Sequence, residues 1–201
     1  EKKKLNLMEK LIGLKKIETA VFISGTGSNL KNLIKFSKNK NSPISIKLII
    51  SNNKKAIGLK YAIRNKIVKK VLNFNNRNIA EKNTLKILKK KKIKFICLAG
   101  FMKIFSNYFI KEFNGKIINI HPSLLPKYKG LNTHERAIKN KDRFSGASVH
   151  KVTQKLDSGE IVMQRKIKIL KNDNLISLKK KVLKIEHDLY PKAIEKFLTK
   201  L

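Results

Sequence analysis

The chain of 201 residues is poor in cysteine and has no long apolar segment. Its single cysteine, Cys97, lies within an apolar run and cannot form an internal disulfide. No apolar run reaches the ~18 residues that are needed to cross a bilayer. Residues 1–5 (Glu-Lys-Lys-Lys-Leu) lack the apolar run and the cleavage site of a signal peptide. These absences predict a cytoplasmic protein without membrane association, in which Cys97 is a buried structural residue.

Acidic residues are also scarce, with 13 Asp and Glu against 48 Lys and Arg and a net charge of +35. A charge of this size suggests binding to nucleic acid. However, the lysines are scattered along the whole length, and no RNP-type aromatic box, zinc-ligand spacing or basic-region heptad accompanies them. We therefore expect no dedicated nucleic-acid partner, while the charge should attract phosphorylated small molecules.

Segments with strand character alternate with segments of helical periodicity. The length and the 41% hydrophobic content suit the core of one domain. Because such alternation builds βαβ units, we expect a single α/β domain with a doubly wound, mostly parallel sheet flanked by helices. Residues 1–17 are expected to form an N-terminal extension of a domain that spans 18–201. The predicted strands are 19–24, 44–50, 67–72, 95–98, 117–120, 147–152 and 161–169, and the predicted helices are 28–37, 54–65, 78–91, 107–113, 133–140 and 174–198.

Asn119 and His121 stand two residues apart at the end of an apolar run. In a strand, such positions point to the same face. Pro122 lacks the N–H that a strand interior needs, so the strand should end there. An amide and an imidazole then project from the carboxyl end of a strand, where open α/β sheets bind ligands. With a carboxylate from elsewhere, these groups can support acyl transfer through a tetrahedral intermediate.

Asp157 is the candidate for that carboxylate, although its position before Ser-Gly is equally typical of a simple turn. The chain has four aspartates and four histidines. Ser148 and His150 form a second pair two residues apart and would share one face of their strand. His134 and His187 are expected to be ordinary surface or core residues. No two histidines have helical ligand spacing, so the sequence predicts no metal site.

A glycine-containing loop, residues 23–30, follows the first predicted strand and precedes a predicted helix. Ser28 or Asn29 can cap that helix. Glycines let the backbone approach an anion closely, and exposed N–H groups at the start of a helix bind phosphate. The loop is neither a Walker loop nor a full dinucleotide fingerprint, because Leu30 occupies the place of the third glycine. It suits a monophosphate, while a tight turn without a ligand remains the alternative.

Taken together, these segments resemble the folate-dependent glycinamide ribonucleotide (GAR) formyltransferases of de novo purine biosynthesis. The resemblance covers about residues 19–198, and its motifs occur in the order of that family. The motifs are Ile-Ser-Gly-Thr-Gly-Ser-Asn (23–29), Leu-Ala-Gly-Phe-Met-Lys-Ile (98–104), Asn-Ile-His-Pro-Ser-Leu-Leu-Pro-Lys-Tyr-Lys-Gly-Leu (119–131), Ser-Val-His (148–150), Leu-Asp-Ser-Gly (156–159) and Glu-His (186–187).

The resemblance implies a Rossmann-like domain that transfers the formyl group of 10-formyltetrahydrofolate to the amine of GAR, without a metal. Asn119, His121 and Asp157 would be catalytic, with Ser148 and His150 in supporting positions. Asn119 and protonated His121 would stabilise the oxyanion, and His121 would be the general acid toward N10 of the leaving folate. Asp157 would raise the pKa of His121 and keep it charged near neutral pH.

The resemblance also implies two groups of binding residues. The ribose phosphate of GAR would lie at the glycine-containing loop, and the folate would lie against the segment 102–105. Lys103 stands where many relatives have arginine, and lysine lacks the planar fork of arginine. Phe105 stands where leucine is common. The implied GAR-binding residues are Gly27, Ser28, Asn29 and Glu186, and the implied folate-binding residues are Arg77, Met102, Lys103, Ile104, Phe105 and Asn119.

Three alternatives are weighed against GAR formyl transfer. Methionyl-tRNA formyltransferases share the Asn-x-His…Asp core but carry a further C-terminal domain, and formyltetrahydrofolate deformylases carry a regulatory N-terminal domain. The length of 201 residues favours GAR formyl transfer over both. A basic RNA-binding module explains the charge but not Asn119, His121 and Asp157. We expect small-molecule substrates and a monomer or weak homodimer, and the sequence leaves open whether the Leu125–Pro126 peptide bond is cis.

Overall fold

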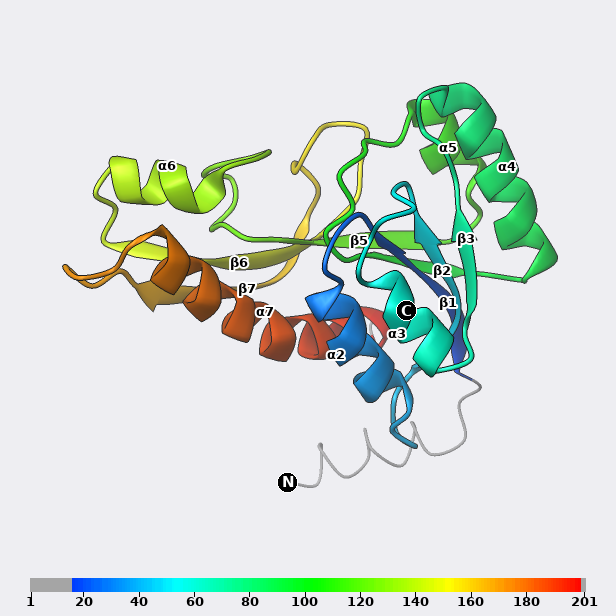
Figure 1. The fold of residues 1–201 in the computed structure, drawn as a ribbon, viewed down its shortest axis with the longest axis horizontal. Helices are drawn as coiled ribbons and strands as arrows, with labels where there is room; N and C mark the ends of the chain where they lie inside the picture. Colours follow the sequence, from blue (N-terminus) through cyan, green and yellow to red (C-terminus); the bar gives the residue numbers. More distant parts are fainter. Residues whose placement is uncertain (1–15, 200–201) are drawn as a thin grey trace.

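The computed structural model describes residues 16–199, so residues 1–15 of the expected N-terminal extension lie outside the described residues. Each predicted strand and helix is present (Figure 1). Within the described part of the chain, no helix is long and apolar enough to cross a membrane. The elements are β1 (Ile17–Ile23), α2 (Ser28–Ser37), β2 (Ile44–Ser51), α3 (Leu59–Arg64), β3 (Val68–Val71), α4 (Arg77–Lys90), β4 (Phe95–Leu98), α5 (Asn107–Glu112), β5 (Lys116–His121), α6 (Thr133–Lys139), β6 (Phe144–Lys151), β7 (Ile161–Lys168) and α7 (Leu175–Leu198).

The strands form one seven-stranded sheet in the order β3-β2-β1-β4-β5-β6-β7. The neighbours from β3 to β5 pair in parallel, whereas β6 is antiparallel to both β5 and β7. This topology confirms the predicted mostly parallel sheet. The order reverses direction beside β1, so the carboxyl ends of β1 and β4 open onto the crevice where ligands bind in such folds.

Helices cover both faces of the sheet, which confirms the doubly wound arrangement (Figure 1). Successive side chains of β1 point to opposite faces, so Val21 belongs to one apolar cluster and Phe22 to the other. The first cluster includes residues of α2, α3 and α7, and the second includes residues of α4 and α5. Cys97 lies fully buried in the first cluster, as predicted.

Several element boundaries differ from the prediction, and tertiary contacts decide the larger shifts. β6 begins at Phe144 instead of residue 147, because its backbone pairs with β7 from Lys168 onward. β1 begins at Ile17, two residues early, because its backbone pairs with Ile44 of β2.

α3 begins at Leu59 instead of residue 54. The preceding residues form turns, and the Gly58 N–H donates to the Gly25 carbonyl at 3.0 Å. This contact ties the chain before α3 to the glycine-containing loop, which helical periodicity alone does not reveal.

The close approach of these two loops makes a substitution at Gly27 costly. Gly27 has a φ of 73°, and a Cβ added there would lie 2.6 Å from the Gly58 Cα. We expect Gly27→Ala to lower the free energy of unfolding by roughly 1–3 kcal/mol. The alanine would have to adopt a left-handed φ, and its Cβ would also clash with the backbone of Gly58. A Cβ added at Gly25 meets nothing within 4 Å. Urea titration of Gly27→Ala and the control Gly25→Ala tests this, and equal losses in the two variants would contradict it.

Candidate active site

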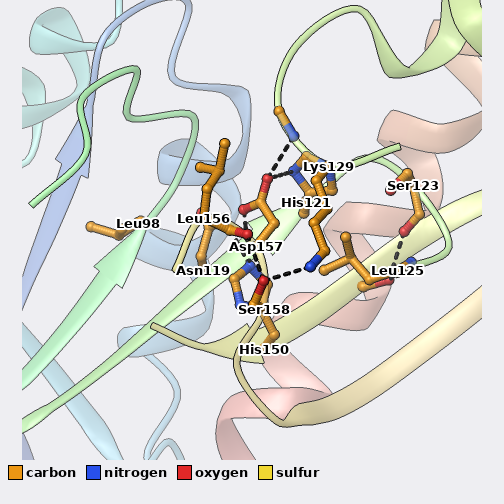
Figure 2. Close-up of polar contacts among 12 residues, drawn as sticks. Leu98, Asn119, His121, Ser123, Leu125, Lys129, His150, Leu156, Asp157 and Ser158 are labelled. Carbon is orange, nitrogen blue, oxygen red and sulfur yellow. Dashed lines mark hydrogen bonds and ion pairs between the residues drawn. The ribbon is translucent and has the colours of Figure 1, made fainter. Parts of the chain in front are cut away.

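His121 and Asp157 come together at the carboxyl end of β5, where both side chains are nearly buried (Figure 2). His121 is the last residue of β5, as the proline boundary predicts. Asp157 lies in a turn of the β6–β7 connection, with a φ of 45° that aspartate tolerates. Its Oδ2 accepts the Gly130 N–H at 2.8 Å and lies 3.4 Å from His121 Nδ1. Asp157 therefore occupies a turn and also enters the predicted site.

Asn119 and His150 face each other because β5 and β6 pair them directly. The His150 Nδ1 donates to the Lys151 carbonyl at 2.8 Å, since a carbonyl oxygen only accepts. In the neutral imidazole, Nε2 then accepts from Asn119 Nδ2 at 3.1 Å. The same Nε2 lies 3.4 Å from Asp157 Oδ1. His150 thus orients the Asn119 amide, which keeps a second N–H for a ligand.

Both ring nitrogens of His121 have partners within the protein. Nε2 donates to the Tyr128 carbonyl at 2.8 Å, so Nδ1 is the nitrogen that faces Asp157. Nδ1 carries a hydrogen only when the ring is charged, and the 3.4 Å separation is longer than an ordinary hydrogen bond. A direct proton transfer to a substrate therefore requires that His121 exchange one of these two contacts.

The pKa shifts at this pair correct one sequence-based expectation. Burial lowers the pKa of His121 below its ordinary value, and the Tyr128 carbonyl and Asp157 only partly oppose it. Burial raises the pKa of Asp157, but contacts with His150, the Gly130 N–H and His121 make the net shift downward. Asp157 therefore raises the pKa of His121 as expected, but burial outweighs this contribution and the net pKa of His121 lies below its ordinary value.

Ser148 supports the loop that follows β5 and does not line the cavity of the site. Its hydroxyl donates to the Ser123 carbonyl at 2.6 Å and accepts the Leu125 N–H at 3.1 Å. Gln164 Nε2 also donates to this hydroxyl, at 2.7 Å. The Leu125–Pro126 peptide bond, which the sequence left open, is cis. The side chain of Ser148 therefore holds the loop that carries the Tyr128 carbonyl.

Asn119, His121, His150 and Asp157 line a cavity of about 450 Å³. This volume lies within the ~300–1,000 Å³ range of small-molecule sites. The segment 102–105 forms part of its wall, as expected, and Met102 is 63% exposed there. Phe105 also belongs to the lining, as expected, although its ring is largely buried in the core and stacks on Phe109 with centroids 4.0 Å apart.

Arg77 does not line this cavity. It is the first residue of α4 and borders a neighbouring hollow that also contacts Met102, Lys103 and Ile104. The two hollows therefore share the segment 102–104, and Arg77 borders the second hollow.

The residues expected to bind GAR meet at the start of α2, beside the cavity rather than in its lining. Asn29 Nδ2 donates to Glu186 Oε2 of α7 at 2.9 Å, and both side chains are buried. The Asn29 Oδ1 is buried without a partner. Neither Ser28 nor Asn29 caps α2, which corrects the prediction: Gly27 is the N-cap, without a side-chain cap hydrogen bond. The first turn of α2 therefore keeps N–H groups that can bind an anion.

Glu186 makes the stability of the protein depend on pH. Burial raises its pKa from 4.5 to about 7, and the Asn29 side chain only partly opposes this shift. Between pH 4.5 and about 7 the folded state holds a proton that the unfolded state has lost, so the free energy of unfolding falls as pH rises. We expect the difference in unfolding free energy between wild type and Glu186→Gln to fall by up to roughly 3 kcal/mol across this window. Urea titrations at several pH values test this, and parallel pH curves would contradict it.

Sequence reasoning missed two backbone groups that hold the catalytic candidates. The Tyr128 carbonyl and the Gly130 N–H fix His121 and Asp157, respectively. Tyr128 and Gly130 both have positive φ, at 56° and 77°. Gly130 was the one residue of the segment 127–131 whose type indicated an unusual backbone conformation. The contacts themselves are made by backbone atoms, so residue types do not reveal them. Among residues 16–199, no group of three or more His, Cys, Asp or Glu residues could hold a metal ion.

Known proteins share both the sequence and the fold of this chain. The formyl transferase family model matches residues 17–194. Phosphoribosylglycinamide formyltransferase of Haemophilus influenzae is 40% identical over 187 residues, covering 92% of this chain and 87% of that protein. The crystal structure of phosphoribosylglycinamide formyltransferase from Brucella melitensis has a TM-score of 0.86 and 39% identity, covering 91% of this chain and 96% of that chain.

A further relative is the trifunctional purine biosynthetic protein adenosine-3 of Homo sapiens, which is 39% identical over 184 residues. The match covers 90% of this chain but 18% of that protein, so this chain spans less than a fifth of the trifunctional relative. The fold and the site define an α/β enzyme with an amide, an imidazole and a carboxylate at the carboxyl edge of its sheet. The chain belongs to the formyl transferase family.

Proposed function

We propose that this chain transfers the formyl group of 10-formyltetrahydrofolate to the amine of 5'-phosphoribosylglycinamide (GAR), giving formyl-GAR and tetrahydrofolate. The gathering of Asn119, His121 and Asp157 at one cavity supports this proposal most directly. The Haemophilus influenzae and Brucella melitensis relatives, both named phosphoribosylglycinamide formyltransferase, support the choice of GAR as acceptor.

The two substrates would occupy different parts of the site. The exposed apolar side chains of Met102 and Ile104 suit the folate ring system, with Lys103 and Arg77 toward its anionic end. The buried ring of Phe105 would support this wall from behind. The first-turn N–H groups of α2 suit the phosphate of GAR. Glu186 and Asn29 suit its ribose hydroxyls, because a carboxylate accepts hydrogen bonds and the Asn29 Oδ1 has no partner.

The chemistry follows from the reaction. The amine of GAR attacks the formyl carbon and gives a tetrahedral oxyanion, which the free N–H of Asn119 would stabilise by ~3–4 kcal/mol. A proton must leave the former amine and reach N10 of the departing folate. His121 is suited to move this proton, and Asp157 stabilises its charged form when the ring gains a proton. His150 keeps the Asn119 amide oriented throughout.

Three further expectations from the sequence stay predictions. They are the cytoplasmic location, the monomeric or weakly dimeric state, and the absence of a dedicated nucleic-acid partner.

The proposal is tested by mixing the purified protein with GAR and 10-formyltetrahydrofolate and following tetrahydrofolate release by absorbance. Release that depends on GAR is the expected result. Release that does not depend on GAR would indicate a deformylase instead. If no tetrahydrofolate is released with or without GAR, and the protein binds RNA in a salt-sensitive way, a basic RNA-binding module would be favoured.

A further inference from the structure

The segment 128–130 joins His121 and Asp157, the two side chains that the proposed mechanism uses for proton transfer. The Tyr128 carbonyl accepts the Nε2–H of His121 at 2.8 Å, and the Gly130 N–H donates to Asp157 Oδ2 at 2.8 Å. The imidazole and the carboxylate come from different parts of the chain, so their relative placement depends on where this segment lies. A residue that holds the segment can therefore position both groups.

The backbone of this segment adopts conformations that need support from outside. Tyr128 has a φ of 56° and Gly130 a φ of 77°. A left-handed φ is unfavourable for a residue as bulky as tyrosine. Such a conformation persists where the surrounding structure determines it. The contacts that hold Tyr128 therefore decide where its carbonyl points.

Arg136 of α6 supplies contacts of this kind. Its guanidinium lies over the Tyr128 ring, 4.8 Å from the ring centroid, and its Nη1 donates to the Lys129 carbonyl at 2.8 Å. The planar guanidinium group is suited both to stacking on an aromatic face and to donating hydrogen bonds at its edge. At the end of the same helix, Asn140 Nδ2 donates to the Tyr128 hydroxyl at 2.8 Å. α6 thus holds the side chain of Tyr128 and the carbonyl that follows it.

Two other side chains also reach Tyr128. Lys127 Nζ lies 5.1 Å from the centroid of the ring, but it pairs with Asp142 at 2.7 Å. Ser123 Oγ donates to the Tyr128 carbonyl at 3.3 Å and more closely, at 2.7 Å, to the Lys127 carbonyl. Among residues 16–199, Arg136 differs from both because it also binds the carbonyl of the next residue.

α6 is itself fixed to the strand that carries His121. The Thr133 hydroxyl donates to the Pro122 carbonyl at 2.8 Å, and Thr133 and Ala137 are buried. Arg136, in contrast, is exposed and does not line the cavity. It can therefore act on the reaction only through the residues that it holds.

We propose that Arg136 is a positioning residue, which fixes the Tyr128 carbonyl against His121 and thereby keeps Nδ1 of the ring toward Asp157. This inference rests on the proposed function, because it assumes that His121 moves a proton during formyl transfer. If the segment 128–130 were free to move, the ring of His121 could turn or carry its hydrogen on Nδ1. Arg136 would prevent this from outside the cavity.

The charge of Arg136 does not explain such a role. Burial is the largest cause of the lowered pKa of His121, the Tyr128 carbonyl raises this pKa, and the charge of Arg136 is a smaller cause that lowers it. The other charges that act on the ring are those of Asp157, which raises its pKa, and His150, which lowers it. By its charge alone Arg136 would oppose the protonation of His121, whereas the contact that it supports favours protonation.

The kinetic test compares Arg136→Ala and Arg136→Lys with Lys139→Ala, a matched control on the same helix. Lys139 is exposed and does not line the cavity. We expect both Arg136 variants to lower kcat about tenfold, because a lysine keeps the charge but not the planar group that holds the segment. The KM values for GAR and 10-formyltetrahydrofolate should stay within about twofold of wild type, as should every constant of Lys139→Ala.

A spectroscopic measurement reads the state of His121 directly. Long-range ¹H–¹⁵N NMR spectra at about pH 8, above the ordinary pKa of histidine, show which ring nitrogen carries the hydrogen. In wild type and in Lys139→Ala it should be Nε2, which donates to the Tyr128 carbonyl. Both Arg136 variants should show a mixture of the two tautomers, with urea midpoints near wild type because Arg136 is exposed.

Three results would overturn the role of Arg136. The first is a wild-type kcat in both Arg136 variants. The second is a lowered kcat with the hydrogen still on Nε2 of His121, because the loss would then not pass through that ring. The third is a mixture of tautomers with kcat unchanged, because the reaction would then not need this positioning.

The design separates the two proposals. If the wild type transfers formyl groups and both Arg136 variants match it in kcat and in tautomer, only the inference on Arg136 fails. If the wild type transfers no formyl group, the proposed function fails, and the tautomer of His121 still shows whether Arg136 holds the ring in place.

Discussion

Replacing His121 with alanine is expected to lower kcat for formyl transfer by ~10²–10⁴-fold, because the site loses its proton-transfer group. His121 is held by the Tyr128 carbonyl on one side and faces Asp157 on the other. The KM values for GAR and 10-formyltetrahydrofolate should change little, since the proposed binding residues other than Asn119 lie outside β5. Steady-state kinetics of the purified variant measures this effect.

A second variant shows that the loss is chemical rather than structural. His121→Gln keeps an amide that can donate to the Tyr128 carbonyl, so the loop after β5 should stay in place. We expect His121→Gln to unfold near the wild-type midpoint in urea and to have the same low kcat as His121→Ala. Turnover near the wild-type level in either variant would remove His121 from the mechanism.

Asp157→Asn is expected to lower kcat by at least ~10²-fold and to change its pH dependence. The asparagine oxygen can still accept the Gly130 N–H, so the turn should be preserved. The lost negative charge no longer stabilises a protonated His121, and the pKa of His121 should fall further. A general acid works below its pKa, so the falling limb of the kcat profile should move to lower pH.

Asp188 provides the matched control for Asp157. Its carboxylate is exposed and pairs with Arg165 and Lys192, away from the cavity. We expect Asp188→Asn to keep kcat within about twofold of wild type at every pH, because exposed ion pairs contribute little. An unshifted pH profile in Asp157→Asn would show that Asp157 does not act through the charge of His121.

The strands could be predicted from the sequence because their apolar runs are short, separated and bounded by turn residues. The mostly parallel sheet and the two helical layers follow from βαβ alternation and need no detail of side-chain packing. The order of the strands and the antiparallel pairing of β6 were not predicted. The start of α3 could not be predicted, since the Gly58 contact with Gly25 joins residues 33 positions apart. The burial of the Phe105 ring could not be predicted for a similar reason. An apolar residue next to a predicted pocket has the same pattern whether its ring faces the ligand or the core.

The part of the site that consists of functional side chains could be predicted from the sequence. Asn119 and His121 followed from strand period and Pro122, and the structure brings Asp157 to them as expected. The lowered pKa of His121 could not be predicted, because burial of the ring causes it. Lys179 is one of many lysines in the sequence, and only the fold shows that it lines the cavity.

Transfer of an isotopic label is the most direct test of formyl transfer to GAR. The protein is incubated with GAR and with 10-formyltetrahydrofolate that carries ¹³C in its formyl group. The products are then separated, and their masses are measured by mass spectrometry. We expect the label in formyl-GAR, in amounts equal to the tetrahydrofolate released, and a loss of that product in His121→Ala. Label found in formate, with GAR unchanged, would contradict the proposed function.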